Sequence, residues 1–481
     1  MEAESLKDRT AKGLLLGGMS NGVQQLLNLL FGICLARLLN ADDYGMIGML
    51  TIFAALASAL IESGFTNALA RKKDAGEKDF NAVFWCSLLI GISLYLLLFS
   101  CAPLISRFFH QPDLVPLARF LFVGFVISST AIVPNALFYR QLEVKPKAVA
   151  QIAGLIISGI VGIILAWKGF SYWGIATQNI VYVSVFTTLM WWQTEWHPTL
   201  HINLRPVKEM LGFSSKLMLT NVFLHINNNI ISVLLGRWYT RSDVGNYTQA
   251  SKWNTIGYSL ITNMISGIAM PVLTSVSDDR NRQRKVFRKM LRFTAFVSFP
   301  SMLGLALTAN EFIVITITEK WLPAAQLLQL LCVMGAFSPI ASLYTNLIIS
   351  DGRGSTFMYG SMALGLLQLL ILSIMQQYGI FMMVEAYVGL YILWLLFWHY
   401  WAHRIMQIRL TEALKDIMPF LVITLIALAA GYMTTLTIEN IYLRMMAKVA
   451  VVGFVYLTIM RLTNATILNE SIQYIKKRRH G

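Results

Sequence analysis

Hydrogen-bonding side chains recur at helical spacing inside two apolar stretches of the chain. Residues spaced i, i+4, i+7 and i+11 share one face of a helix. The residues with this spacing are Asn21, Gln25, Asn28 and Gly32, and, two hundred positions later, Asn221, His225, Asn228 and Ser232. Amide, imidazole and hydroxyl groups can bind a hydroxyl-rich ligand, or they can hydrogen-bond a neighbouring helix. The residues alone leave both uses open.

The next apolar segment after each stretch has a similar polar face. The polar residues of these two segments are Thr51, Ser58 and Glu62, and Ser251, Thr255, Tyr258 and Thr262. Polar side chains that face lipid are costly, so these faces should point inward. Four such helices predict a hydrated central cavity, whereas one or two would only join helices.

Basic residues outnumber acidic ones in and near these segments. The basic residues are Lys216, Lys252, Arg37, Arg119 and Arg237, and Glu62 is the acidic residue deep in an early segment. The excess predicts an anionic substrate group such as a phosphate or carboxylate. Arginine suits phosphate because its planar guanidinium can bind two oxygens at once.

These charges also have structural interpretations. Asp43 and Asp243 follow Arg37 and Arg237 by six residues, so a local ion pair can shape each helix corner. Arg119 can extend toward the membrane surface. Glu62 can couple transport to a cation, or it can be a hydrogen-bonded structural residue.

Motifs for catalysis and for metal or cofactor binding are missing from the sequence. There is no GxxxxGK[ST] phosphate loop, no His/Cys cluster with metal-ligand spacing and no His–carboxylate pair suited to hydrolysis. A membrane glycosyltransferase should carry acidic catalytic residues on large outward loops, and the predicted outward loops are short. We therefore expect no enzyme activity, no catalytic residues, no metal and no cofactor.

The elements that position the polar residues are membrane-spanning helices. Of the 481 residues, 56% are hydrophobic and 13% are charged, too few charges to cover a soluble protein of this size. Apolar runs long enough to cross about 30 Å of hydrocarbon recur along the chain. We predict an all-α polytopic fold with fourteen spans, at 13–39, 46–70, 81–104, 114–138, 148–167, 174–194, 212–239, 247–275, 293–315, 325–349, 357–377, 382–401, 418–437 and 444–461. Pro271 and Pro300 predict kinks whose freed backbone groups neighbouring helices can satisfy.

The distribution of charge predicts the orientation. Most of the 39 Lys and Arg residues fall on the side of the two termini, including 280–292 and the tail 476–479. By the positive-inside rule both termini are cytoplasmic. The net charge of +15 then indicates contact with anionic membrane lipids, not with nucleic acid.

The first and seventh spans are related by sequence. Segments 21–45 and 221–245 align without a gap, and the aligned identities include Asn21 with Asn221, Asn28 with Asn228, Arg37 with Arg237, Asp43 with Asp243, and Gly45 with Gly245. We predict two parallel six-helix lobes, 1–200 and 201–405, followed by an added helix pair and a basic tail, 406–481. Many transporters have internal repeats, with the substrate site at the repeat interface and alternating access by rocking.

The segment ARLLNADDYG at the end of the first span resembles the ARxLxxxDxG corner of the polysaccharide-transporter branch of the MATE-like (MOP) flippases, which includes the Wzx-type exporters. Arg37, Asp43 and Gly45 match that corner. Residues 253–278 are similar to the colanic-acid exporter subgroup. The resemblance implies alternating-access transfer of undecaprenyl-diphosphate-linked oligosaccharide from the cytoplasmic to the outer leaflet of a bacterial inner membrane, near a polysaccharide polymerase complex.

Two other functions compete with this one. A MATE-type cation-coupled antiporter of small organic molecules should have an acidic or aromatic cavity, whereas this cavity is predicted to be basic. A non-transporting scaffold for polysaccharide assembly would not need polar faces on four helices.

Overall fold

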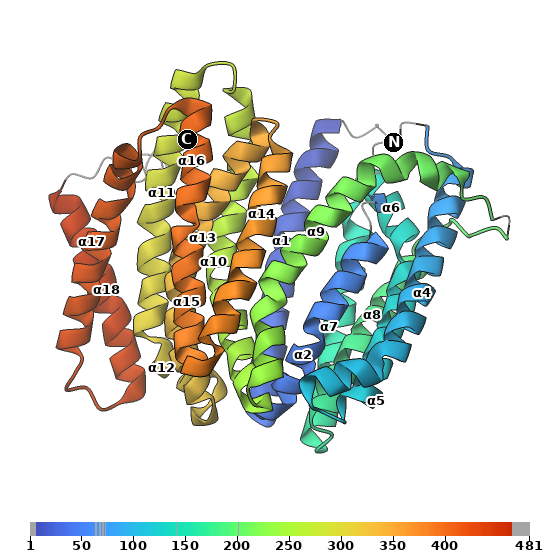
Figure 1. Ribbon diagram of the computed structural model, residues 1–481, viewed down its shortest axis with the longest axis horizontal. Helices are drawn as coiled ribbons and strands as arrows, with labels where there is room; N and C mark the ends of the chain where they lie inside the picture. The colour runs from blue at the N-terminus through green and yellow to red at the C-terminus, as the bar shows by residue number, and fades with distance from the viewer. Residues whose placement is uncertain are drawn as a thin grey trace. The chain divides into compact units, whose positions relative to one another are not determined.

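A computed structural model describes residues 6–62, 65–66, 69, 72, 74–141, 143–200 and 202–463, with the backbone alone for 6–17, 62 and 208–220. Within this part of the chain every regular element is a helix, as the sequence predicted (Figure 1). Contacts divide the chain into two units, Met1–Gly245 and Asn246–Gly481. These units differ in their bounds from the predicted repeat lobes, 1–200 and 201–405, which stay a prediction.

The first unit is built from α1 (Leu6–Leu38), α2 (Ala41–Glu62), α4 (Glu77–Phe109), α5 (Leu114–Thr130), α6 (Ile132–Arg140), α7 (Val144–Trp167), α8 (Tyr172–Trp192) and α9 (Arg205–Trp238). Small residues let α7 approach its neighbours closely. A Cβ added at Gly162 would lie 3.0 Å from Gln178 of α8, and one added at Gly174 would lie 3.2 Å from the Ala166 nitrogen. Small residues have this role in membrane helix packing.

The second unit contains most of α10 (Arg241–Ser275), then α11 (Arg280–Leu307), α12 (Ala309–Ile317), α13 (Leu322–Ser350), α14 (Gly354–Met375), α15 (Ile380–Leu393), α16 (Leu395–Met406), α17 (Leu410–Thr434) and α18 (Ile441–Leu462), with short 3₁₀ turns at Glu319–Trp321 and Gln376–Tyr378. The helix α13 is buried along most of its length and packs against α11, α15 and α16.

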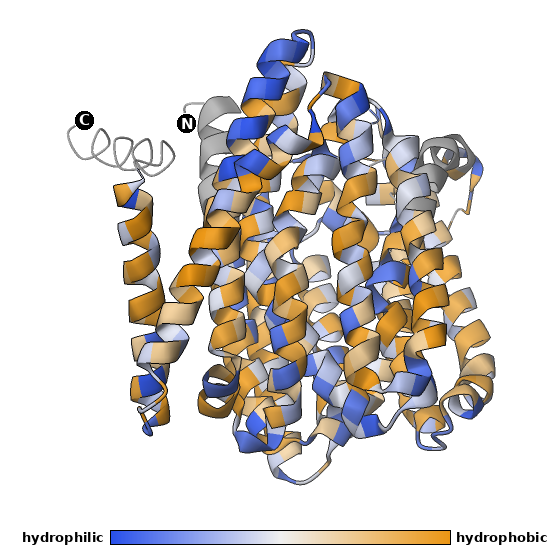
Figure 2. Cartoon of the chain, turned by 60° about the vertical axis from the view of Figure 1, so that its left-hand side comes forward, coloured by the Kyte–Doolittle hydropathy of each residue, from blue (hydrophilic) through white to orange (hydrophobic). Residues whose placement is uncertain are grey.

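The described part of the chain has 11 helical segments long and apolar enough to cross a membrane. The other three predicted spans fall on α1, α8 and α9, and the total of fourteen stays a prediction. Hydrophobic residues dominate along the helices, while hydrophilic ones are frequent at the helix ends (Figure 2). The chain is therefore a multi-pass membrane protein, as expected.

The last two helices form a pair that packs against α11 (Figure 1). Ion pairs hold one end of this contact: Arg284 lies 2.5 Å from Glu412, and the Nε of Arg288 lies 2.6 Å from Asp416. Farther along, the hydroxyl of Tyr456 donates to the carbonyl of Phe296 at 2.9 Å. That carbonyl has no helical donor because the residue four positions on is Pro300, which lacks an N–H. The expectation that a neighbouring helix satisfies the backbone freed at Pro300 is confirmed.

Candidate functional site

The helix α1 presents three different faces. Its packing face holds Ser20 and Gln24, and Gln24 donates to the side chain of Gln151 in α7 at 3.1 Å. Its predicted polar face is exposed at Asn21, Gln25 and Asn28. A third face is exposed and apolar, with Met19, Leu26 and Leu30 each more than half exposed.

The two exposed faces of α1 point in nearly opposite directions. At about 100° per residue, the Asn21–Asn28 stripe lies roughly 150° from the centre of the Met19–Leu30 face. Lipid can cover the apolar face at no cost, whereas unpaired amides in hydrocarbon are costly. The arrangement suits a helix with lipid on one side and water on the other.

The matching stripe on α9 is less uniform. Asn221 and Asn228 are exposed, and His225 and Ser232 are half-buried. The neighbouring Asn229 turns back along the helix and donates to the His225 carbonyl at 2.9 Å. Of the three consecutive asparagines, Asn227 is buried, Asn229 is half-buried and Asn228 is exposed.

The predicted charged residues differ in how far the structure describes them. The side chains of Lys216 and Glu62 lie outside the described part. Lys252 on α10 is half-buried, and among the described residues it has no hydrogen-bond or ion-pair partner. An unpaired ammonium in a membrane helix marks a functional site by default. Tyr258, also half-buried, lies six residues farther along α10.

Arg119 contacts an aromatic ring of the neighbouring helix α4. Its guanidinium lies over the ring of Phe99 in α4, 4.2 Å from the ring centroid. Such a cation–π contact joins α4 to α5. This position favours the structural interpretation of Arg119 over substrate contact.

The two helix corners are capped in the same way. Asp43, at the third position of α2, accepts from the Asn40 backbone N–H at 2.9 Å. Asp243, at the third position of α10, accepts from the Thr240 N–H at 3.1 Å and from its hydroxyl at 2.7 Å. Both carboxylates form the reverse half of a capping box. The shared aspartate therefore fixes where each helix begins.

The two corner glycines make reciprocal contacts. A Cβ at Gly45 would collide with the carbonyl of Arg241, and a Cβ at Gly245 would collide with the carbonyl of Ala41. The first turns of α2 and α10 therefore touch backbone to backbone, with the related residues exchanged. Only glycine permits so close an approach.

The arginine of the second corner does not form the predicted ion pair. Arg237 donates to the Phe108 carbonyl at 2.8 Å, and its Nη1 lies 2.9 Å from the ring nitrogen Nε2 of His110. These residues end α4, whose free carbonyls favour a cation. For Arg237, the expectation of an ion pair with Asp243 is therefore wrong, because the end of α9 packs on a distant helix. Arg37 is exposed.

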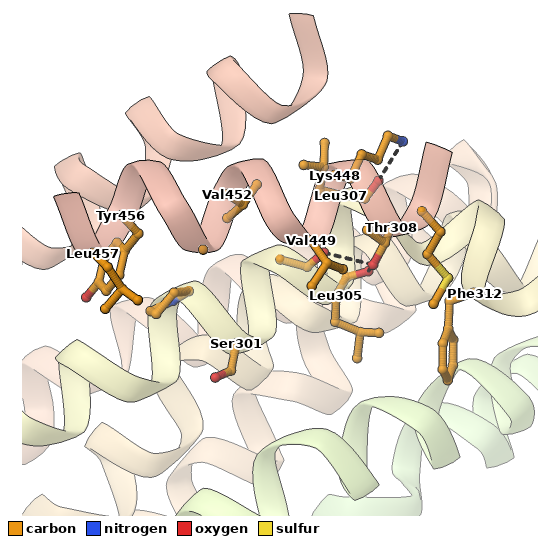
Figure 3. A pocket seen from close by; sticks show the side chains of 14 residues that line it. Ser301, Leu305, Leu307, Thr308, Phe312, Lys448, Val449, Val452, Tyr456 and Leu457 are labelled. Carbon is orange, nitrogen blue, oxygen red and sulfur yellow. Dashed lines mark hydrogen bonds between the residues drawn. The ribbon is translucent and has the colours of Figure 1, made fainter. Parts of the chain in front are cut away.

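A buried ionic cluster in the second unit was not predicted from the sequence. Glu311 of α12 is 2% exposed; its Oε1 lies 2.7 Å from the ammonium of Lys448 and 2.8 Å from the Nε of Arg444, both on α18. The cluster adjoins a groove of about 430 Å³ between α11–α12 and α18 (Figure 3). The i, i+4 spacing of Arg444 and Lys448 inside a span was the available signal.

A multi-pass helical membrane protein with a repeated, capped corner and polar helix faces has the features of a transporter built from internal repeats. Comparison with known proteins identifies the family. Residues 34–326 match the family model described as "Polysaccharide biosynthesis protein". The chain belongs to this family.

One relative matches most of the chain in sequence, and two solved structures share its fold. The chain is 24% identical to the lipopolysaccharide biosynthesis protein WzxC of Escherichia coli (strain K12), over 73% of this chain and 71% of that protein. Its fold is similar to the lipid II flippase MurJ in an inward closed conformation, with a TM-score of 0.77 at 18% identity, over 94% of this chain and all of that one. An inward-facing multidrug resistance MATE family transporter of the MOP superfamily gives 0.65 at 17% identity, over 80% and 96%. The predicted MATE-like fold and family resemblance are confirmed.

Proposed function

We propose that this protein is a flippase for lipid-linked oligosaccharides. It transfers undecaprenyl-diphosphate-linked repeat units from the cytoplasmic to the outer leaflet of a bacterial inner membrane by alternating access, with both of its own termini cytoplasmic. Family membership supports a role in polysaccharide biosynthesis, and the likeness to a lipid II flippase supports a fold suited to it. Transport, not catalysis, is the activity that these relatives suggest.

The observation that carries the proposal is the pair of opposed exposed faces on α1. The amides of Asn21, Gln25 and Asn28 can hydrogen-bond sugar hydroxyls on the wet side while lipid covers the other side. A second polar face, on α9, holds Asn221, His225, Asn228 and Ser232 and is exposed at Asn221 and Asn228. Lys252 and Tyr258, with Lys216, are the groups we assign to the diphosphate.

We assign the two corners the role of a gate. Arg37, Asp43 and Gly45 form one corner, and Arg237, Asp243 and Gly245 form the other. The reciprocal glycine contact supports this role, because a contact without intervening side chains can open without repacking a core. Glu62 is our candidate for cation coupling, which a Glu62→Gln variant should abolish while leaving insertion intact.

Gene deletion tests the proposal in the cell. Surface polysaccharide and undecaprenyl-diphosphate-linked oligosaccharide are measured together by mass spectrometry. Loss of the polymer with intact repeat units accumulating on the cytoplasmic side is expected, and it would also identify the cargo. Unchanged polymer without accumulated lipid would contradict the assignment.

The antiporter alternative rests on the likeness to a multidrug MATE transporter. Expression in a pump-deficient host separates the two functions. A flippase should leave drug susceptibility unchanged, whereas a gain of resistance would favour the antiporter. The exposed amides, and a lysine with no partner among the described residues, fit a hydroxyl-rich anion better than an organic cation.

A further inference from the structure

The groove between α11–α12 and α18 opens at the surface of the second unit. Val452 and Tyr456 form its buried floor, and Val449 and Leu457 are about half exposed at its rim. In Figure 3 these apolar side chains extend along one side of α18, with Lys448 at one end. In a membrane protein such a rim faces lipid.

Hydrogen bonds from α18 to α11 bound the groove. Near one end the Lys448 ammonium donates to the carbonyl of Leu307, at 3.2 Å, and near the other the Tyr456 hydroxyl donates to the carbonyl of Phe296. Both carbonyls lack a helical donor: Leu307 ends α11, and Pro300 removes the donor for Phe296. The lining residues from Met445 to Leu457 span about 18 Å of helix at 1.5 Å per residue.

The charged end of the groove is positive. Arg444 and Lys448 contribute two cations against the one carboxylate of Glu311. The ammonium of Lys448 has three N–H donors, and two of them are used, on Leu307 and Glu311. An anionic group at the mouth would therefore complete both the hydrogen bonding and the charge balance.

We propose that this groove binds one acyl chain of an anionic glycerophospholipid, with the lipid phosphate at Lys448 and Arg444. The groove length of about 18 Å matches the depth of one leaflet, roughly half of the 30 Å hydrocarbon core. An undecaprenyl chain is much longer and would overrun it. The bound lipid fills the space between α18 and α11–α12 and fastens the α17–α18 pair. This site is separate from the proposed transport path and does not depend on the cargo.

Two glycines allow the groove to be filled without touching the ionic cluster. Gly304 and Gly453 both line it, and a Cβ at either meets nothing within 4 Å. Gly453→Leu and Gly304→Leu should place side chains where the acyl chain lies. Gly389→Leu on α15 is the matched control, because Gly389 also has open space at its Cβ but does not line the groove.

Native mass spectrometry of the full-length protein, titrated with phosphatidylglycerol, measures the binding. We expect at least about a tenfold weaker Kd for Gly453→Leu, which corresponds to about 1.4 kcal/mol, and no change for Gly389→Leu. The triple variant Glu311→Gln/Arg444→Gln/Lys448→Gln, which leaves the cluster uncharged, should lose the preference for phosphatidylglycerol over phosphatidylcholine.

Equal affinity in the filled and control variants would overturn the proposal. So would displacement of phosphatidylglycerol from the groove by undecaprenyl phosphate, which would make the groove a cargo site. Because the readout is lipid binding, a failure here leaves the flippase proposal untouched, and a failure of flipping leaves this site intact.

Discussion

At the scale of single residues, the corner glycines permit a backbone contact that any side chain would block. Gly45 and Gly245 lie two hundred positions apart, and each contacts the backbone of the helix that carries the other. The repeat alignment predicted that they correspond, because identical residues recurred at one offset. It could not predict that they meet, since that depends on how distant helices pack.

Substituting either corner glycine should destabilise the protein. The new methyl group of Gly45→Ala or Gly245→Ala would collide with a backbone carbonyl, and overpacking of this kind costs about 1–3 kcal/mol. Thermal unfolding in detergent should show a lower Tm for both. Gly267→Ala on α10 is the control, because its Cβ meets nothing. A Tm equal to that of the control would mean that the contact does not form.

Lys252 is the charge whose removal separates function from stability most clearly. Since it has no partner in the described structure, Lys252→Met should leave Tm unchanged or raise it. Export should fall at least about tenfold if the ammonium binds the diphosphate, a loss of about 1.4 kcal/mol. Lys252→Arg should retain most of the activity. Full export by Lys252→Met, measured as surface polysaccharide, would remove this residue from the path.

At the scale of elements, α18 is fastened to α11 and α12 by contacts whose partners helix periodicity could not identify. Glu311 and Lys448 are separated by 137 residues, and each alone resembles an ordinary charge near a helix end. Pro300 did signal a freed carbonyl, but the identity of Tyr456 as its donor came from the structure. Local sequence patterns predicted where the helices lie. Contacts between residues far apart in the sequence determine which helices pack together.

Removal of the Tyr456 hydroxyl should loosen this pair. In Tyr456→Phe the Phe296 carbonyl would lose its donor, and such membrane hydrogen bonds contribute about 0.6–2 kcal/mol. We expect a lower Tm and faster hydrogen exchange in α18. Tyr442→Phe, at an exposed position of the same helix, should change neither. Matching behaviour of the two variants would show that the hydroxyl contributes nothing.

At the scale of the whole molecule, the sequence predicted the helical membrane class, the family and the approximate places of the 11 candidate spans found in the described part of the chain. These follow from composition, apolar run length and a corner motif, all of which are local. The partners of Arg237 and Glu311 were not predictable in this way. Assigning the polar faces to a transit path still rests on the exposure of Asn21, Gln25 and Asn28 and on the stripe of α9.

Replacing Asn221, His225 and Asn228 together with leucine tests the second polar face. Leucine is favourable in a membrane helix, so insertion and expression should be preserved. Export should be abolished, because the sugar hydroxyls would lose their hydrogen-bonding partners. Surface polysaccharide and membrane-fraction protein are measured side by side. Wild-type export by this variant would favour a scaffold over a transporter.

The most direct test of the central claim uses purified protein in liposomes that contain undecaprenyl-diphosphate-linked oligosaccharide in both leaflets. An impermeant glycosidase added outside cleaves only the outward-facing sugar. With a sodium or proton gradient imposed, we predict that the protein makes the protected inner pool accessible, while the triple leucine variant behaves like protein-free vesicles. A protected pool that persists with the wild-type protein under both gradients would contradict the account.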